Sequence, residues 1–165
     1  MSLSRSIPTL LLLLSLGCAT SQQSAPPALD CVRDPGSVAL DMWDAVIEGY
    51  EAADEEKPPA SDSIVFIGSS SIWFWDTLSE DMTPLPSLNR GFGGSVIVQS
   101  THYVDRIVLP YEPSAVVLYA GDNDIALGSN SDCAALDFDD FVKRIHADAP
   151  QTPIYFISIK PLSLI

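Results

Sequence analysis

Two short, continuous apolar runs constrain the fold of this chain more than any other feature. The run 64–67 ends at Gly68, and the run 115–119 ends two residues before Gly121. Apolar runs of this length, without polar alternation, are typical of strands buried on both faces of a parallel sheet. The chain therefore needs helices that cover both faces of such a sheet.

The pattern around these runs alternates between strand and helix. We expect parallel strands near 63–67, 86–91, 115–120 and 153–159, and helices at about 38–55, 95–109 and 138–146. Strands connected through helices form right-handed crossovers, which predicts an α/β fold with three layers, α/β/α, around a parallel sheet. A length of 165 residues suits one such domain.

The charge balance is strongly acidic. The chain has 22 Asp and Glu residues against 8 Lys and Arg residues, a formal net charge of −14. Such a field repels phosphate backbones, so we expect no nucleic-acid partner. The helix near 38–55 has an acidic face, which we interpret as solvated surface and which comprises Asp44, Glu48, Glu51 and Glu55.

The first residues have the features of an export signal. Arg5 precedes an apolar run that extends to Leu16 and is too short to span a bilayer, so residues 1–17 are interpreted as a signal peptide. The segment 14–18 resembles the bacterial lipobox, which predicts lipidation of Cys18, although Ser15 and Leu16 depart from the pattern. Ordinary cleavage near residue 19 is the alternative. Either outcome predicts an exported protein of the bacterial cell envelope, in the periplasm or as an outer-membrane lipoprotein.

Residues 18–35 follow as a tether rich in Ser, Gln, Ala and Pro, which leaves 36–165 for the folded domain. We expect the membrane to be contacted only through the lipid anchor. Export would bring Cys31 and Cys133 into an oxidising compartment, where they either form a disulfide or remain two free thiols.

Each of the first three predicted strands ends in a turn of small and polar residues. These turns are 68–71, 91–95 and 121–124. The carboxyl ends of parallel strands meet at one edge of the sheet, where α/β folds bind ligands. The sequence therefore predicts a site at this edge.

Together, the three turns resemble the first three conserved blocks of the SGNH (GDSL-type) hydrolases, over residues 36–161. Ser69 stands where the first block usually has Asp, and the segments 89–95 and 121–124 are similar to the second and third blocks. The resemblance implies a flavodoxin-like SGNH hydrolase fold, with Ser70 as nucleophile and with the Gly94 backbone and the Asn123 side chain as oxyanion donors. It also implies ester hydrolysis through an acyl-serine intermediate, without a metal or organic cofactor, on a small-molecule or carbohydrate ester.

The family supplies its catalytic base from a carboxyl-terminal Asp-x-x-His, which this sequence lacks. The chain's two histidines, His102 and His146, lie outside such a motif and are interpreted as surface or packing residues. We therefore expect an incomplete hydrolase domain that is marginally stable and a poor esterase.

The sequence leaves alternatives for the function of the chain and for the role of two tryptophans. One alternative is an inactive binding or interaction protein of the envelope that retains the fold. A phosphate- or nucleotide-binding loop at 68–71 is disfavoured by the negative charge and by the absence of a following lysine. Trp73 and Trp75 either line a substrate pocket or pack in the core.

Overall fold

The computed structural model describes Cys31 and residues 38–159. The elements, in chain order, are α1 (Asp44–Glu56), β1 (Ile64–Gly68), α2 (Ser70–Trp73), α3 (Leu78–Asp81), β2 (Ser87–Gly91), α4 (Ile97–His102), α5 (Val104–Ile107), the 3-10 turn η1 (Leu109–Tyr111), β3 (Ala115–Tyr119), α6 (Asp122–Ala126), α7 (Ser131–Asp148) and β4 (Ile154–Phe156). The expected signal peptide (1–17), Cys18 and, apart from Cys31, the tether (18–35) lie outside the described residues.

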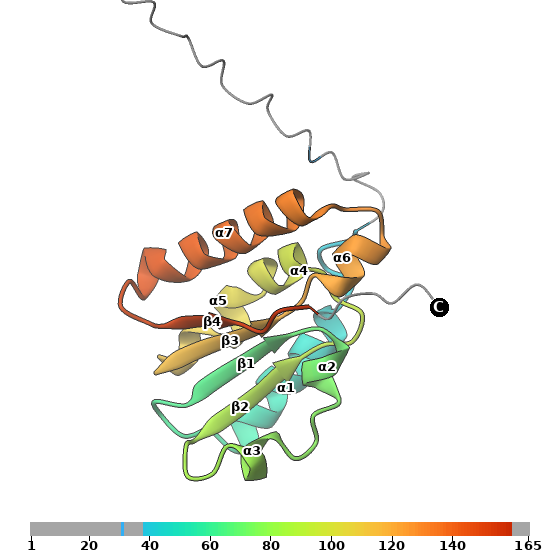
Figure 1. Cartoon of the computed structure of the whole chain (residues 1–165). Coiled ribbons are helices and arrows are strands. Elements are labelled where there is room, and N and C mark those ends of the chain that lie inside the picture. The colour runs from blue at the N-terminus through green and yellow to red at the C-terminus, as the bar shows by residue number, and fades with distance from the viewer. Residues whose placement is uncertain (1–30, 32–37, 160–165) are drawn as a thin grey trace, which may run out of the picture.

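The four strands form one parallel sheet in the order β2-β1-β3-β4 (Figure 1). Helices cover both of its faces, so the predicted three-layer α/β/α fold is confirmed. Both strands predicted from continuous apolar runs, β1 and β3, occupy the middle of the sheet. No helix among the described residues has the length and apolar character that crossing a bilayer requires.

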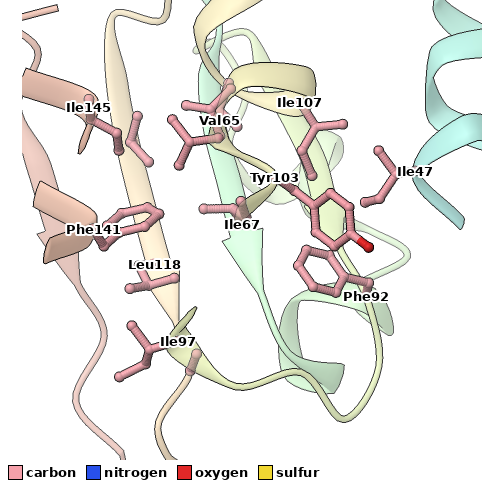
Figure 2. Packing of buried hydrophobic residues seen from close by; sticks show 14 residues of the cluster. Ile47, Val65, Ile67, Phe92, Ile97, Tyr103, Ile107, Leu118, Phe141 and Ile145 are labelled. Carbon is pink, nitrogen blue, oxygen red and sulfur yellow. The ribbon is translucent and has the colours of Figure 1, made fainter. Parts of the chain in front are cut away.

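The larger part of the core lies on the face covered by α1, α4, α5 and α7. Val65 and Ile67 of β1 and Leu118 of β3 pack there against Tyr103, between α4 and α5, and against Phe141 of α7 (Figure 2). All five side chains are fully buried. Successive side chains of a strand point to opposite faces, so Phe66 contributes to the other face.

The second face has a smaller cluster. Phe66 and Val117 pack against Ile72 of α2 and Leu78 of α3. Both helices have only four residues, and each contributes one buried side chain to this cluster. At the other end of the sheet order, β4 pairs only with β3 among the described residues, and its Tyr155 is 59% exposed.

Four predicted elements have different limits. The first helix is Asp44–Glu56 instead of 38–55. The helix expected at 95–109 is divided into α4, α5 and η1, with a break at Tyr103. The last helix begins at Ser131 instead of 138, because the Asn130 side chain accepts the N–H of Cys133 and caps it. The last strand is 154–156, shorter than the expected 153–159.

The acidic face of the first helix is only partly a solvated surface, which corrects the sequence interpretation. Asp44 and Glu51 both form salt bridges with Arg106 of α5, at 2.9 and 2.7 Å. These partly exposed ion pairs join α1 to α5 on the same face of the sheet.

The outer edge of β2 is capped by side chains. Pro86 O and Phe92 N form hydrogen bonds with β1. Backbone groups alternate in direction along a strand, so those of residues 87, 89 and 91 point away from β1. The Asn89 carbonyl accepts a hydrogen bond from Arg90 Nη1 at 3.0 Å, and the Gly91 carbonyl accepts the hydroxyl of Tyr50. Gly91 N–H donates to Asn89 Oδ1 at 2.9 Å. These bonds occupy groups that could otherwise pair with a strand of another chain.

A buried ion pair anchors this cap. Asp54 of α1 accepts Arg90 Nη2 at 2.5 and 2.6 Å, and Tyr111 donates its hydroxyl to the same carboxylate. The guanidinium carbon lies 4.8 and 4.9 Å from the ring centres of Tyr50 and Tyr111. Burial, followed by the hydrogen bond to Asp54, raises the pKa of Tyr111 to about 12. The carboxyl end of β2 is thereby fixed to α1 and η1.

Candidate active site

Ser70 stands at a tight strand-to-helix turn. β1 ends at Gly68, whose φ of +134° favours glycine, and a Cβ there would lie 2.0 Å from the Tyr119 carbonyl oxygen. Ser69 is buried, and its N–H donates to the same carbonyl at 2.8 Å. Ser70 follows as the partly exposed first residue of α2, where backbone N–H groups have no partner within the helix.

Gly94 lies in the turn after β2. It is exposed and has a φ of +75°, which again favours glycine. The nearest atom to a Cβ at this position would be Trp43 Cζ2 at 3.9 Å, so the space around it is open. A substrate atom could therefore approach the backbone of this turn closely.

Asn123 lies in the equivalent turn after β3. It is the second residue of α6, behind Gly121, whose φ is +117°. Its Nδ2 donates to the carbonyl of Ser95 at 3.0 Å, which holds the turn after β3 against the turn after β2. A carboxamide nitrogen carries two hydrogens, so one remains for a ligand.

Two side chains that the sequence did not single out connect these turns. Asp124 is buried, and both its carboxylate oxygens accept the N–H of Ile97, at 3.3 and 3.2 Å, which joins α6 to the start of α4. Asn89 donates Nδ2 to the Ile72 carbonyl at 2.6 Å, which joins β2 to α2. The only indication of these two residues in the sequence is their position inside the segments 89–95 and 121–124. A third contact, from Ser69 Oγ to Asp122 at 3.4 Å, joins the turns after β1 and β3.

The sheet order brings the three predicted site residues to one edge. Because β1 lies between β2 and β3, the turn with Ser70 has the turn with Gly94 on one side and the turn with Asn123 on the other. In Figure 1, α2 and α6 lie at the same end of the sheet. A common focus for the Gly94 N–H and the Asn123 amide stays a prediction.

The fold of this chain is similar to that of several solved structures. A GDSL-like lipase from Bacteroides thetaiotaomicron VPI-5482 superposes with a TM-score of 0.60 at 20% identity, over 71% of this chain and 60% of that chain. The chain has the SGNH hydrolase fold. A protein from Streptococcus pneumonia named as a platelet activating factor gives a TM-score of 0.61 at 21% identity, over 71% and 55% of the two chains. One from Bacteroides fragilis NCTC 9343, named as an acylhydrolase, gives 0.55 at 22%, over 66% and 55%.

These similarities concern the fold. The chain spans 55–60% of the length of these three solved structures. No protein-family model and no curated protein matches it.

Neither histidine reaches Ser70 of this SGNH fold by a hydrogen bond. His102 ends α4, is exposed and packs its ring against Tyr103 at 4.7 Å. His146 Nε2 lies 3.0 Å from the carbonyl of Thr152. Thr152 precedes β4 and so lies at the amino ends of the strands, whereas Ser70 follows the carboxyl end of β1. The structure does not bring either histidine together with the predicted nucleophile.

The aromatic residues after Ser70 have different surroundings. Trp75 packs edge-on against Phe66 of the smaller cluster, and its indole N–H donates to Asp81 at 2.6 Å. Trp73 is 40% exposed and stacks on Phe74 with ring centres 5.1 Å apart. Trp75 is therefore partly a core residue, whereas Trp73 is available to a ligand.

Cys31 and Cys133 are joined as a disulfide in the structure, with their Cα atoms 5.5 Å apart. Cys133 is in the first turn of α7, shortly after α6. The bond therefore attaches residue 31 to the domain close to the edge that carries the three turns.

Proposed function

We propose that this protein is a serine hydrolase that cleaves a small-molecule or carbohydrate ester. The observation that supports this proposal is the sheet order, which sets the turn of Ser70 between the turns of Gly94 and Asn123. In this proposal Ser70 is the nucleophile, and Ser70 N–H, Gly94 N–H and the Asn123 carboxamide are the oxyanion donors.

The reaction proceeds in two steps. Ser70 Oγ attacks the ester carbonyl carbon while its proton passes to a base, and the negative charge that develops on the carbonyl oxygen is stabilised by the three donors. The tetrahedral intermediate collapses, the alcohol leaves with the proton, and the acyl group remains on Ser70. Water then attacks the acyl-serine and releases the acid. Removal of one donor of this kind costs about 10²–10³ in rate.

The proposed reaction requires a base that takes the proton of Ser70. Neither histidine hydrogen-bonds Ser70, and without a base the remaining catalysis in a triad enzyme is about 10³–10⁴ over water. This observation favours a second candidate, a binding or interaction protein of the envelope that retains the fold. We expect turnover of the chain below about 1 per second, which is low for an enzyme.

The proposed location is the bacterial cell envelope, with Cys18 as the lipidated residue. The disulfide between Cys31 and Cys133 supports export, because disulfides persist in oxidising compartments. Replacement Cys18→Ala should release the protein from the membrane fraction. A variant that stays membrane-bound would contradict the anchor.

Labelling with a fluorophosphonate probe separates the two functional candidates. The full chain, Ser70→Ala and Ser71→Ala are compared for labelling and for hydrolysis of a short-chain ester. Ser71 is the exposed neighbour of Ser70 and serves as a matched control. The esterase proposal requires labelling and turnover that are lost only in Ser70→Ala. A folded parent chain that neither labels nor turns over would instead support the binding protein.

A further inference from the structure

Trp73 connects the predicted oxyanion turn to a neighbouring groove. A Cβ on Gly93 would lie 2.2 Å from Cε3 of the Trp73 ring, so this indole packs directly on the backbone of the residue before Gly94. Trp73 also lies three residues after Ser70, on the same face of α2. A ligand in contact with this indole is therefore next to the predicted reaction centre.

The groove lies beside β2, between α1 and the segment α2–α3, and has a volume of about 410 Å³. This size is within the range of small-molecule sites. Its lining combines two indoles with hydroxyl, amide and carboxylate groups, from residues that include Tyr50, Trp73, Trp75, Asp76, Ser79 and Asn89. None of the described residues that line it is basic.

These groups match one kind of ligand. The Tyr50 hydroxyl and the Asn89 amide already have partners within the protein. An alkyl chain would cover the Asp76 carboxylate and the hydroxyls of Ser79 and Ser87 with apolar atoms that cannot hydrogen-bond, which is costly. An anionic ligand would meet Asp76 and a chain of net charge −14 with no opposing cation in the groove. A neutral ring with hydroxyl groups satisfies both conditions, because its C–H face can cover an indole while its hydroxyls pair with the polar lining.

We infer that this groove is a subsite for a neutral sugar ring, the alcohol part of the ester, with Trp73 as the stacking surface and Asp76 as a hydrogen-bond acceptor. This inference rests on the proposed function for its link to catalysis, because it places the sugar beside the ester bond that Ser70 attacks. The site itself is defined by the groove and can be tested by binding alone.

The test is an NMR titration that follows the three tryptophan indole N–H signals. Full-length Ser70→Ala is titrated with xylotriose and acetylated xylotriose, and then with butyl acetate, phenyl acetate and glucuronate. The sugars should shift the signals of Trp73 and Trp75 with saturation in the millimolar range, a usual affinity for a single small subsite. The signal of Trp43, whose indole donates to Gln99 and does not line the groove, should shift less than those of Trp73 and Trp75.

Variants identify the groove as the site. Trp73→Ala should weaken sugar binding at least about fivefold, in line with the contribution of one aromatic contact. Asp76→Ala changes an exposed side chain outside any packed cluster and should weaken it similarly. Tyr155→Ala, an exposed aromatic on β4, is the matched control and should bind as the parent does.

The possible outcomes separate the inference from the proposed function. The subsite is refuted if butyl acetate, phenyl acetate or glucuronate shifts Trp73 as strongly as xylotriose, or if sugar binding survives in both groove variants. Ser70-dependent ester hydrolysis without sugar binding would refute the subsite alone. Saturable sugar binding by a wild-type chain that hydrolyses no ester would uphold the subsite and overturn the proposed esterase.

Discussion

Asp54→Asn should strongly destabilise the protein, because it breaks the buried ion pair between α1 and β2. The asparagine has the same shape but removes the charge that compensates Arg90, whose side chain is only 6% exposed. Removing one partner of a buried pair typically costs about 3–5 kcal/mol. Asp54 is itself 20% exposed and Asn retains one acceptor oxygen, so we expect the lower limit, about 3 kcal/mol.

Urea unfolding of the full chain, followed by circular dichroism, measures this loss. The control is Asp139→Asn, which removes an ion pair with Lys143 whose side chains are 56% and 66% exposed. Exposed pairs contribute about 0–1 kcal/mol, so this variant should stay close to the parent. Equal unfolding free energies for Asp54→Asn and Asp139→Asn would refute the argument that burial makes the pair at Arg90 important.

Three further predictions concern stability. Gly68→Ala should prevent folding, because its Cβ would lie 2.0 Å from a backbone oxygen. Gly128→Ala, at a φ of +93° with no atom within 4 Å of its Cβ, should lower the unfolding free energy by only about 1–2 kcal/mol. Soluble yield and melting temperature would show whether the two variants differ. Reduction should lower the unfolding free energy by up to about 4.7 kcal/mol, because the bond between Cys31 and Cys133 closes a loop of about 100 residues. A reductant should leave the unfolding free energy of Cys31→Ser unchanged, and the same result for the parent chain would contradict the bond. The unfolding free energy should fall as pH rises from 10 toward 12, because the pKa of Tyr111 is raised in the folded state and the unfolded chain loses this proton more easily. Tyr111→Phe should make the unfolding free energy depend less steeply on pH in this range. An unchanged pH dependence would exclude Tyr111 as its source.

The sequence was most informative where burial leaves little choice of residue. The runs that became β1 and β3 were predicted to within one residue at each end, because strands in the middle of a parallel sheet must be apolar on both faces. The turns with Ser70, Gly94 and Asn123 could be placed at one edge for a related reason: parallel strands bring their carboxyl ends together.

Interactions between distant segments could not be predicted in the same way. The hydrogen bond from Ile97 to Asp124 and the ion pair of Arg90 with Asp54 join residues 27 and 36 positions apart, and no local pattern indicates such partners. The break at Tyr103 interrupts a sequence with apolar spacing that continues past it. The bond between Cys31 and Cys133 stayed open for the same reason, because it depends on a Cα–Cα distance of 5.5 Å that only the fold defines.

The same disulfide defines a path for mechanical force. Tension applied to the chain before Cys31 would enter the domain at that residue, cross the covalent bond to Cys133 and continue along α7. Residues 32–132, which include β1, β2, β3 and all three turns of the candidate site, would lie outside this covalent path. With the bond reduced, the same pull would reach α1 first and tend to separate it from Arg90 and Arg106.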